Sequence, residues 1–230
     1  MSINLSKKTR IWRDKPRDGP ETNDINLDIS HRCTLLCSGC GRQREYLDKG
    51  LKVPGHDMTI EEFHKITDFF SSVTCCGQKS DPLMNNNLPQ FISIAKSKDL
   101  YLQINTAVSH RPERWYRDCF DRFGRGRWTF GIDGLPKDSH KYRINQDGEK
   151  LYRMMTLASS MGIECVWQYI IFRYNENDIE EATRMAKDIN VQLEIRISNR
   201  FFKKNNDPLR PVNPKYYGDE NEEEQRYFTT

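Results

Sequence analysis

The chain has 230 residues, of which 36% are hydrophobic and 11% aromatic. This length supports one substantial hydrophobic core but not two ordinary ones, so we expect a single domain. No window approaches the roughly 18 consecutive apolar residues that a membrane-spanning helix needs, and the first residues contain no apolar stretch typical of a secretion signal. We therefore expect a cytoplasmic protein with no membrane partner.

A net charge of +3, with 30% charged residues, makes the chain polar and mildly basic. This balance does not indicate nucleic-acid binding, which needs lysine and arginine clustered on one face. The densest positive segment is the start, where six lysines and arginines lie between Lys7 and Arg17. We interpret residues 1–24 as a solvated basic extension and expect no nucleic-acid partner.

Strand-like and helix-like segments alternate along residues 25–202, as in repeated βα units. The first predicted strand, 25–30, runs into a cysteine-rich loop, and a helix then begins after Thr59, which forms a capping box with Glu62. Further strands are predicted at 73–76, 100–106, 128–133, 163–172 and 191–198, and further helices at 88–97, 112–123, 148–161 and 176–189. Connections of helix length require parallel pairing with right-handed crossovers. We expect an α/β fold with six parallel strands, followed by a polar coil or mobile tail at 203–230.

Three cysteines follow the first predicted strand at the spacing Cys-x3-Cys-x2-Cys: Cys33, Cys37 and Cys40. Sites in α/β folds lie at the carboxyl ends of the strands, so this position indicates chemistry. Three thiolates from one short loop suit a [4Fe-4S] cluster and leave its fourth iron without a protein ligand. The odd total of seven cysteines also fits a reducing compartment and a metal site better than a disulfide framework.

A structural zinc site is the alternative for these cysteines. Zinc would need a fourth ligand, and the nearest candidate, His31, lies only two residues before Cys33. No second Cys-x2-Cys pair exists to complete such a site. The remaining cysteines are scattered and typical of small buried apolar positions: they are Cys75, Cys76, Cys119 and Cys165.

The segment NLDISHRCTLLCSGCGR at 26–42 resembles the radical S-adenosylmethionine (SAM) superfamily, and the resemblance covers about residues 25–200. It is similar to members that act in pyrroloquinoline quinone and molybdenum cofactor biosynthesis. The resemblance implies a partial (β/α)6 barrel of parallel strands. It also implies an enzyme that reductively cleaves SAM at a [4Fe-4S] cluster to a 5'-deoxyadenosyl radical and abstracts hydrogen from a peptide or small-molecule substrate. The electron donor would be a flavodoxin or ferredoxin.

The resemblance further implies contacts with SAM at the ends of successive strands: Gly77, Asp81, Thr106, Asp133, Arg143 and Asn175. Asp81 would receive the amino group, and Arg143 would offer a bidentate fork to the carboxylate. An ordinary Asp-Pro turn and a surface arginine are the alternatives for these two residues. The chain departs from the family twice: Gly39 stands where many members have an aromatic residue near the adenine, and Gly131 stands where relatives have a serine.

Several points stay open in the sequence. Residues 167–169, Glu194 and Arg196 could line the barrel interior, but strand alternation lets only one parity point inward. Relatives that modify peptides commonly carry a cysteine-rich C-terminal extension for auxiliary clusters, which is lacking here. We therefore expect a substrate that needs no auxiliary cluster, or a partner that supplies the cover. The alternative functions are an activase for a glycyl-radical enzyme and a non-catalytic zinc- or cluster-bearing module that contacts nucleic acid.

Overall fold

The computed structural model describes residues 24–201, 206–217 and 227–229. Its strands form one sheet in chain order: β1 (Asp24–Leu27), β2 (Ser72–Cys76), β3 (Tyr101–Thr106), β4 (Gly126–Gly131), β5 (Glu164–Ile170), β6 (Gln192–Arg196) and β7 (Tyr227–Thr229). Each neighbouring pair from β1 to β6 is parallel, and β7 pairs antiparallel with β6. The predicted partial (β/α)6 barrel is confirmed.

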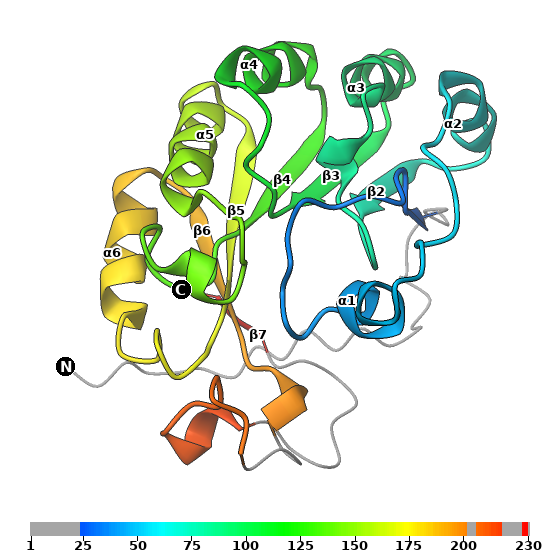
Figure 1. Cartoon of the computed structure of the whole chain (residues 1–230). Coiled ribbons are helices and arrows are strands. Elements are labelled where there is room, and N and C mark those ends of the chain that lie inside the picture. Colours follow the sequence, from blue (N-terminus) through cyan, green and yellow to red (C-terminus); the bar gives the residue numbers. More distant parts are fainter. Residues whose placement is uncertain (1–23, 202–205, 218–226, 230) are drawn as a thin grey trace.

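Helices cover one face of this curved sheet (Figure 1). They are α2 (Ile60–Ile66), α3 (Leu88–Ser97), α4 (Glu113–Arg122), α5 (Gly148–Ser160) and α6 (Ile179–Asp188), while the short α1 (Gly41–Glu45) lies apart from this layer. The predicted capping box of α2 is present: Thr59 Oγ1 accepts from the Glu62 N–H, and the Thr59 N–H donates to Glu62 Oε2 at 2.8 Å. Among the described helices, none has the length and apolarity to cross a bilayer.

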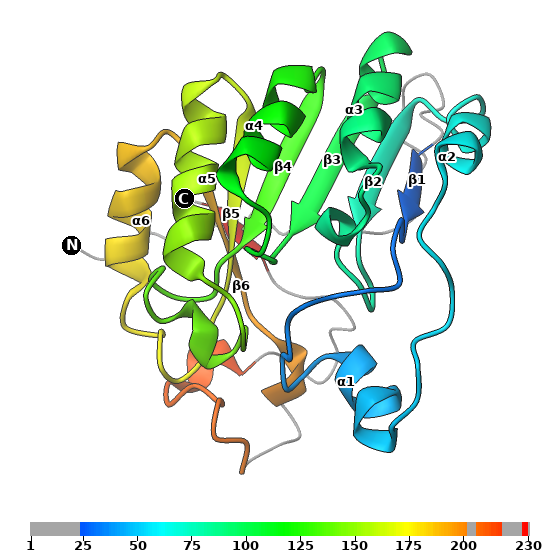
Figure 2. The ribbon, with the colours of Figure 1, turned by 45° about the horizontal axis from the view of Figure 1, so that its top comes forward.

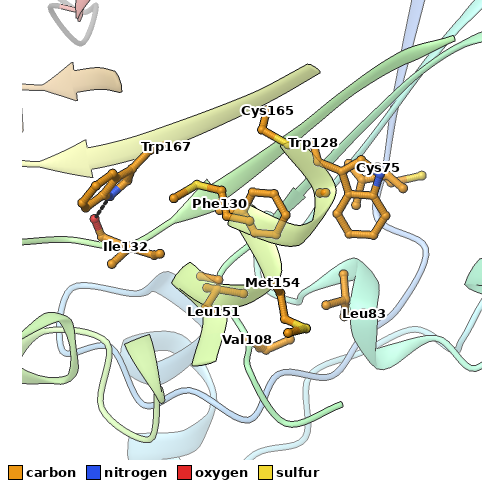
Figure 3. Packing of buried hydrophobic residues seen from close by; sticks show 14 of the residues in the cluster. Cys75, Leu83, Val108, Trp128, Phe130, Ile132, Leu151, Met154, Cys165 and Trp167 are labelled. Carbon is orange, nitrogen blue, oxygen red and sulfur yellow. Dashed lines mark hydrogen bonds between the residues drawn. The ribbon is translucent and has the colours of Figure 1, made fainter. Parts of the chain in front are cut away.

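The hydrophobic core lies between the sheet and these helices (Figure 3). Strand side chains of one parity point into it, including the fully buried Trp128, Phe130 and Trp167. The Trp167 indole N–H donates to the backbone oxygen of Ile132 at 2.8 Å, so its one polar atom is satisfied. Trp167 and Tyr169 are therefore core residues, and the opposite parity of β5 faces the other side of the sheet.

The other side of the sheet carries a group of polar side chains. Its central strands present partly buried side chains there, namely Gln103, Asn105, Arg127, Gln168, Glu194 and Arg196. Arg127 Nε donates to Gln103 Oε1 at 2.9 Å, and the Gln103 amide donates to Asn105 Oδ1 at the same distance. On β6, Arg196 Nε donates to Glu194 Oε1 at 2.7 Å. We call these six residues the polar face. Gln168 of β5 and Glu194 and Arg196 of β6 therefore point away from the helices.

The segment expected to be coil after residue 203 is partly ordered against the domain. The backbone N–H groups of Val212 and Asn213 donate to the carboxylate of Glu176 at 2.8 and 2.9 Å, and the Arg173 N–H donates to the Leu209 oxygen. A short 3-10 helix and β7 also lie in this stretch. These long-range contacts leave no periodic pattern, which is why the sequence did not reveal them. Residues 1–23 of the predicted basic extension, and 203–205, 218–226 and 230 of the predicted tail, lie outside the described residues.

Candidate active site

The cysteine loop leaves β1 and crosses the carboxyl ends of the strands (Figure 2). Three contacts hold it there. The Leu36 N–H donates to the Ile144 oxygen at 3.1 Å, the Asn145 amide donates to the Thr34 oxygen at 3.2 Å, and the Asp81 N–H donates to the Arg32 oxygen at 2.9 Å. The loop is thus fixed by the segments that follow β2 and β4.

All three loop cysteines are free thiols. Cys37 is buried, while Cys33 and Cys40 are partly exposed. The Cys40 N–H donates to the Cys37 oxygen at 3.0 Å, and the Cys33 sulfur accepts from the Leu35 N–H at 3.4 Å. No tight group of three His, Cys, Asp or Glu side chains suited to a single metal ion occurs within 24–201, 206–217 and 227–229.

Arg143 links Cys37 to a buried carboxylate. Its Nε donates to Asp133 Oδ2 at 2.7 Å, and the guanidinium is 15% exposed while Asp133 is fully buried. Burial raises the pKa of the Cys37 thiol, and the charge and hydrogen bond of Arg143 act against that rise. Burial alone would lower the pKa of Arg143, but Asp133 and Cys37 outweigh it, so the guanidinium stays charged.

The charged groups around Cys33 differ from those around Cys37. Burial, and then the charge of Asp81, raises the pKa of Cys33 to about 12, whereas the Leu35 N–H and Arg42 act in the opposite direction. A thiol with this pKa is protonated at neutral pH, and a metal that binds it displaces the proton. The donor set therefore fits an iron-sulfur cluster: three free thiols on one loop, with Arg42 and Arg143 beside them to offset the negative charge of the thiolates.

Asp81 and Thr106 meet in one buried network. Asp81 Oδ1 accepts from the Leu83 N–H at 3.0 Å and from Thr106 Oγ1 at 2.8 Å. Its Oδ2 accepts from the N–H groups of Ala107 and Val108 at 2.8 and 3.3 Å. Because both carboxylate oxygens are already used, a SAM amino group at Asp81 would compete with four internal donors.

Asp133 and Asn175 close the ends of β4 and β5. Asp133 Oδ1 accepts from the Ile170 N–H at 2.8 Å. The Asn175 side chain accepts from the Phe172 N–H at 2.7 Å and donates to the Ile170 oxygen at 3.0 Å. Asn175 is fully buried, so its amide is committed to the turn after β5.

At two glycines near the strand ends, neighbouring atoms leave little or no room for a side chain. A Cβ on Gly77 would lie 1.9 Å from the Ser80 oxygen, so the turn after β2 excludes any side chain at this position. The turn is also tied to β1, because Gln78 N–H and Ser80 Oγ donate to Asp28 Oδ1 at 2.8 and 3.0 Å. A Cβ on Gly131 would lie 3.1 Å from Arg143 Nη2, so the missing serine side chain leaves room for that guanidinium.

Sequence reasoning missed Gln146. This buried amide donates to the backbone oxygens of Ala107 and Gly131 at 2.6 and 2.8 Å, and its oxygen accepts from Ser139 Oγ. It thereby joins the ends of β3 and β4. No spacing or motif distinguishes this glutamine in the sequence.

Comparison with solved structures identifies the fold. The structure of SuiB from Streptococcus suis superposes on 74% of the chain with a TM-score of 0.60 and 11% identity. A structure titled "Native anSMEcpe with bound AdoMet and Cp18Cys peptide" covers 84% with a TM-score of 0.59 and 14% identity. Methylornithine synthase (PylB) covers 72% with a TM-score of 0.52 and 15% identity. The chain has the fold of a radical SAM core domain.

At these identities the likeness concerns the fold alone. The radical SAM fold described here spans 38% of the SuiB chain, 56% of the anSMEcpe chain and 49% of the PylB chain. No protein-family model matches the sequence, and no curated protein does.

Proposed function

We propose that the chain is a radical SAM enzyme that holds a [4Fe-4S] cluster on Cys33, Cys37 and Cys40. The observation that supports this most is the position of three free thiols on the loop after β1, at the strand ends of a radical SAM fold and beside two arginines. When bound, the cluster supplies the electron that cleaves SAM to methionine and a 5'-deoxyadenosyl radical, which takes a hydrogen atom from the substrate.

We assign the SAM carboxylate to Arg143. Its Nε is committed to Asp133, so Asp133 orients the guanidinium while the Nη groups remain able to donate. Asp81, Thr106, Asp133 and Asn175 would support the cofactor by fixing the strand ends, since their side chains are buried and paired within the protein. The turn that begins at Gly77 would then offer backbone carbonyls to the SAM amino group.

The polar face is the surface we propose for the substrate. Its amides and guanidinium groups offer donors and acceptors together, and its one acid, Glu194, is paired with Arg196. Such a surface suits a polar substrate, and a peptide with its row of N–H and C=O groups is well matched to it. Structures with peptides are known for SuiB, bound to precursor peptide SuiA, and for anSMEcpe. A flavodoxin or ferredoxin would supply the electron, in the reducing cytoplasm that the seven free cysteines favour.

The reductive half of this reaction can be tested without knowing the substrate. Anaerobically reconstituted protein, reduced with dithionite, should convert SAM slowly to 5'-deoxyadenosine and methionine, because cluster and SAM suffice for that step. Cys37→Ala protein is the control and should form neither product. Absence of 5'-deoxyadenosine from wild-type protein with a full cluster would contradict the proposed activity.

A further inference from the structure

Arg200, which follows β6, lies against the cysteine loop. It lies in a short 3-10 helix after β6, Asn199–Phe201, which is close to the turn of the loop in Figures 1 and 2. Its Nε donates to Ser198 Oγ and its Nη2 to the Tyr142 hydroxyl, both at 2.9 Å. The guanidinium carbon lies 4.8 Å from the ring centroid of Tyr142 and 5.4 Å from that of Phe172.

The absence of a side chain at Gly39 leaves room for this guanidinium. A Cβ at residue 39 would lie 2.1 Å from Arg200 Nη1 and 2.8 Å from its Cζ, so no side chain fits there unless Arg200 moves. Arg200 therefore packs against the backbone between Cys37 and Cys40. Tyr142, to which it donates, is itself close enough to Cys37 for the thiol to affect the pKa of the phenol.

The charge of Arg200 has no anionic partner in the described part of the chain. Arg143 is paired with Asp133, whereas the contacts of Arg200 are a hydroxyl, a phenol and aromatic rings. Its two hydrogen bonds leave three of the five guanidinium N–H donors without an acceptor among these residues. A partly buried, unpaired cation is costly to keep unless an anion binds near it.

The anion that fits this place is the cluster itself. Three thiolates make a bound cluster negative, and each added electron makes it more so. A fixed positive charge nearby stabilises the reduced form more than the oxidised form and raises the reduction potential.

Building on the proposed cluster, we propose that Arg200 is a positioning residue whose charge makes the cluster easier to reduce, and that Gly39 provides the space for it. The sequence separates these two residues widely, so only the fold brings the charge to the cysteine loop.

The test is an anaerobic redox titration of the reconstituted full chain, followed by electron paramagnetic resonance in the absence of SAM. Arg200→Gln and Gly39→Ala should shift the midpoint potential to more negative values. The expected shift lowers the ratio of reduced to oxidised cluster at a fixed potential by at least about tenfold, or about 59 mV for one electron. Arg200→Lys, which keeps the charge, should retain most of the wild-type potential. The control, Arg117→Gln on α4, loses the same charge from a surface pair with Glu113 and should not change it.

Iron content is measured alongside, to separate charge from packing. If Arg200→Gln protein loses iron, the midpoint potentials of Arg200→Lys and Gly39→Ala are compared instead. An unchanged potential in Arg200→Gln protein with full iron would overturn the role of Arg200. The role of Arg200 would also be overturned if Arg117→Gln shifted the midpoint potential as much as Arg200→Gln, or if Arg200→Lys showed the same shift as Arg200→Gln. In each of these cases the wild-type cluster leaves the proposed function intact, whereas wild-type protein without a cluster would overturn both proposals.

Discussion

Two buried aspartates close the strand ends of this protein in different ways. Asp81 joins β2 to β3 and accepts four hydrogen bonds, all from neutral donors. Asp133 joins β4 to β5 and accepts one backbone N–H and the guanidinium of Arg143. Burial raises the pKa of Asp81, and its four donors oppose that rise.

The two aspartates affect the thiols of the cysteine loop in different ways. The charge of Asp81 raises the pKa of Cys33, whereas Arg143, held by Asp133, acts against the rise at Cys37. In the sequence both acids are aspartates that follow a strand, and both were predicted to contact SAM. Asp81 is paired with the protein's own neutral donors, whereas Asp133 is paired with Arg143, whose charge affects the pKa of Cys37.

The largest effect is expected at Cys37, on the Arg143 side of the loop. Cys37→Ala should abolish cluster binding, because two remaining thiolates cannot hold the cube, and the iron content should fall from about four per chain to near zero. Cys119→Ala removes a thiol from the helix-facing core and should leave the iron content unchanged. Equal loss in the two variants, measured by a colorimetric iron assay, would show that the ligands are misassigned.

Arg143→Gln should have the next largest effect. It leaves Asp133 buried without its cation, so the free energy of unfolding should fall by about 3–5 kcal/mol. SAM affinity of the reconstituted protein should fall by roughly tenfold to a hundredfold, as expected for a lost charge-assisted contact of about 1.5–3 kcal/mol. Denaturant unfolding and calorimetric titration measure the two quantities.

The double variant Asp133→Asn with Arg143→Gln separates these effects. Its neutral pair should recover most of the stability, because no buried charge is left alone, but it should not recover SAM affinity. Recovery of both would mean that Arg143 acts only through the fold.

Asp81→Asn tests the other side of the comparison. An amide NH2 would face two N–H or O–H donors in place of a carboxylate oxygen, so unfolding should be easier by about 1–3 kcal/mol. SAM affinity should change much less than in Arg143→Gln, because the carboxylate serves the protein's own donors. A loss of tenfold or more in a folded, iron-loaded variant would instead support direct contact with the SAM amino group.

The smallest effect is expected at the cap of α2, away from both aspartates. Thr59→Ala removes one bond of the capping box and should cost about 1 kcal/mol of unfolding free energy. Iron content and SAM affinity should stay at wild-type values. A change in either would show that α2 affects the cysteine loop.

The sequence predicted what depends on local pattern. Alternation at Ile25, Leu27 and Ile29 and the capping box at Thr59 placed the first strand and the start of α2 within a few residues. The cysteine spacing predicted a cluster site on the loop after β1, and that site stays a prediction.

What the sequence did not reveal depends on contacts between distant residues. The four donors of Asp81 come from the end of β3, from the two residues that follow it and from the turn of Asp81 itself. Gln146 bridges two strand ends, and Arg200 fills the space beside Gly39. Strand β7 likewise pairs through backbone groups that any sequence offers. Such partners are chosen by tertiary packing, and no local period encodes them.

The most direct test of the central claim is the metal content of the wild-type protein. After anaerobic reconstitution, iron and sulfide analysis with a visible spectrum should give brown protein with about four irons and four sulfides per chain. Colourless protein with one stoichiometric zinc would contradict the cluster assignment and favour a structural metal module.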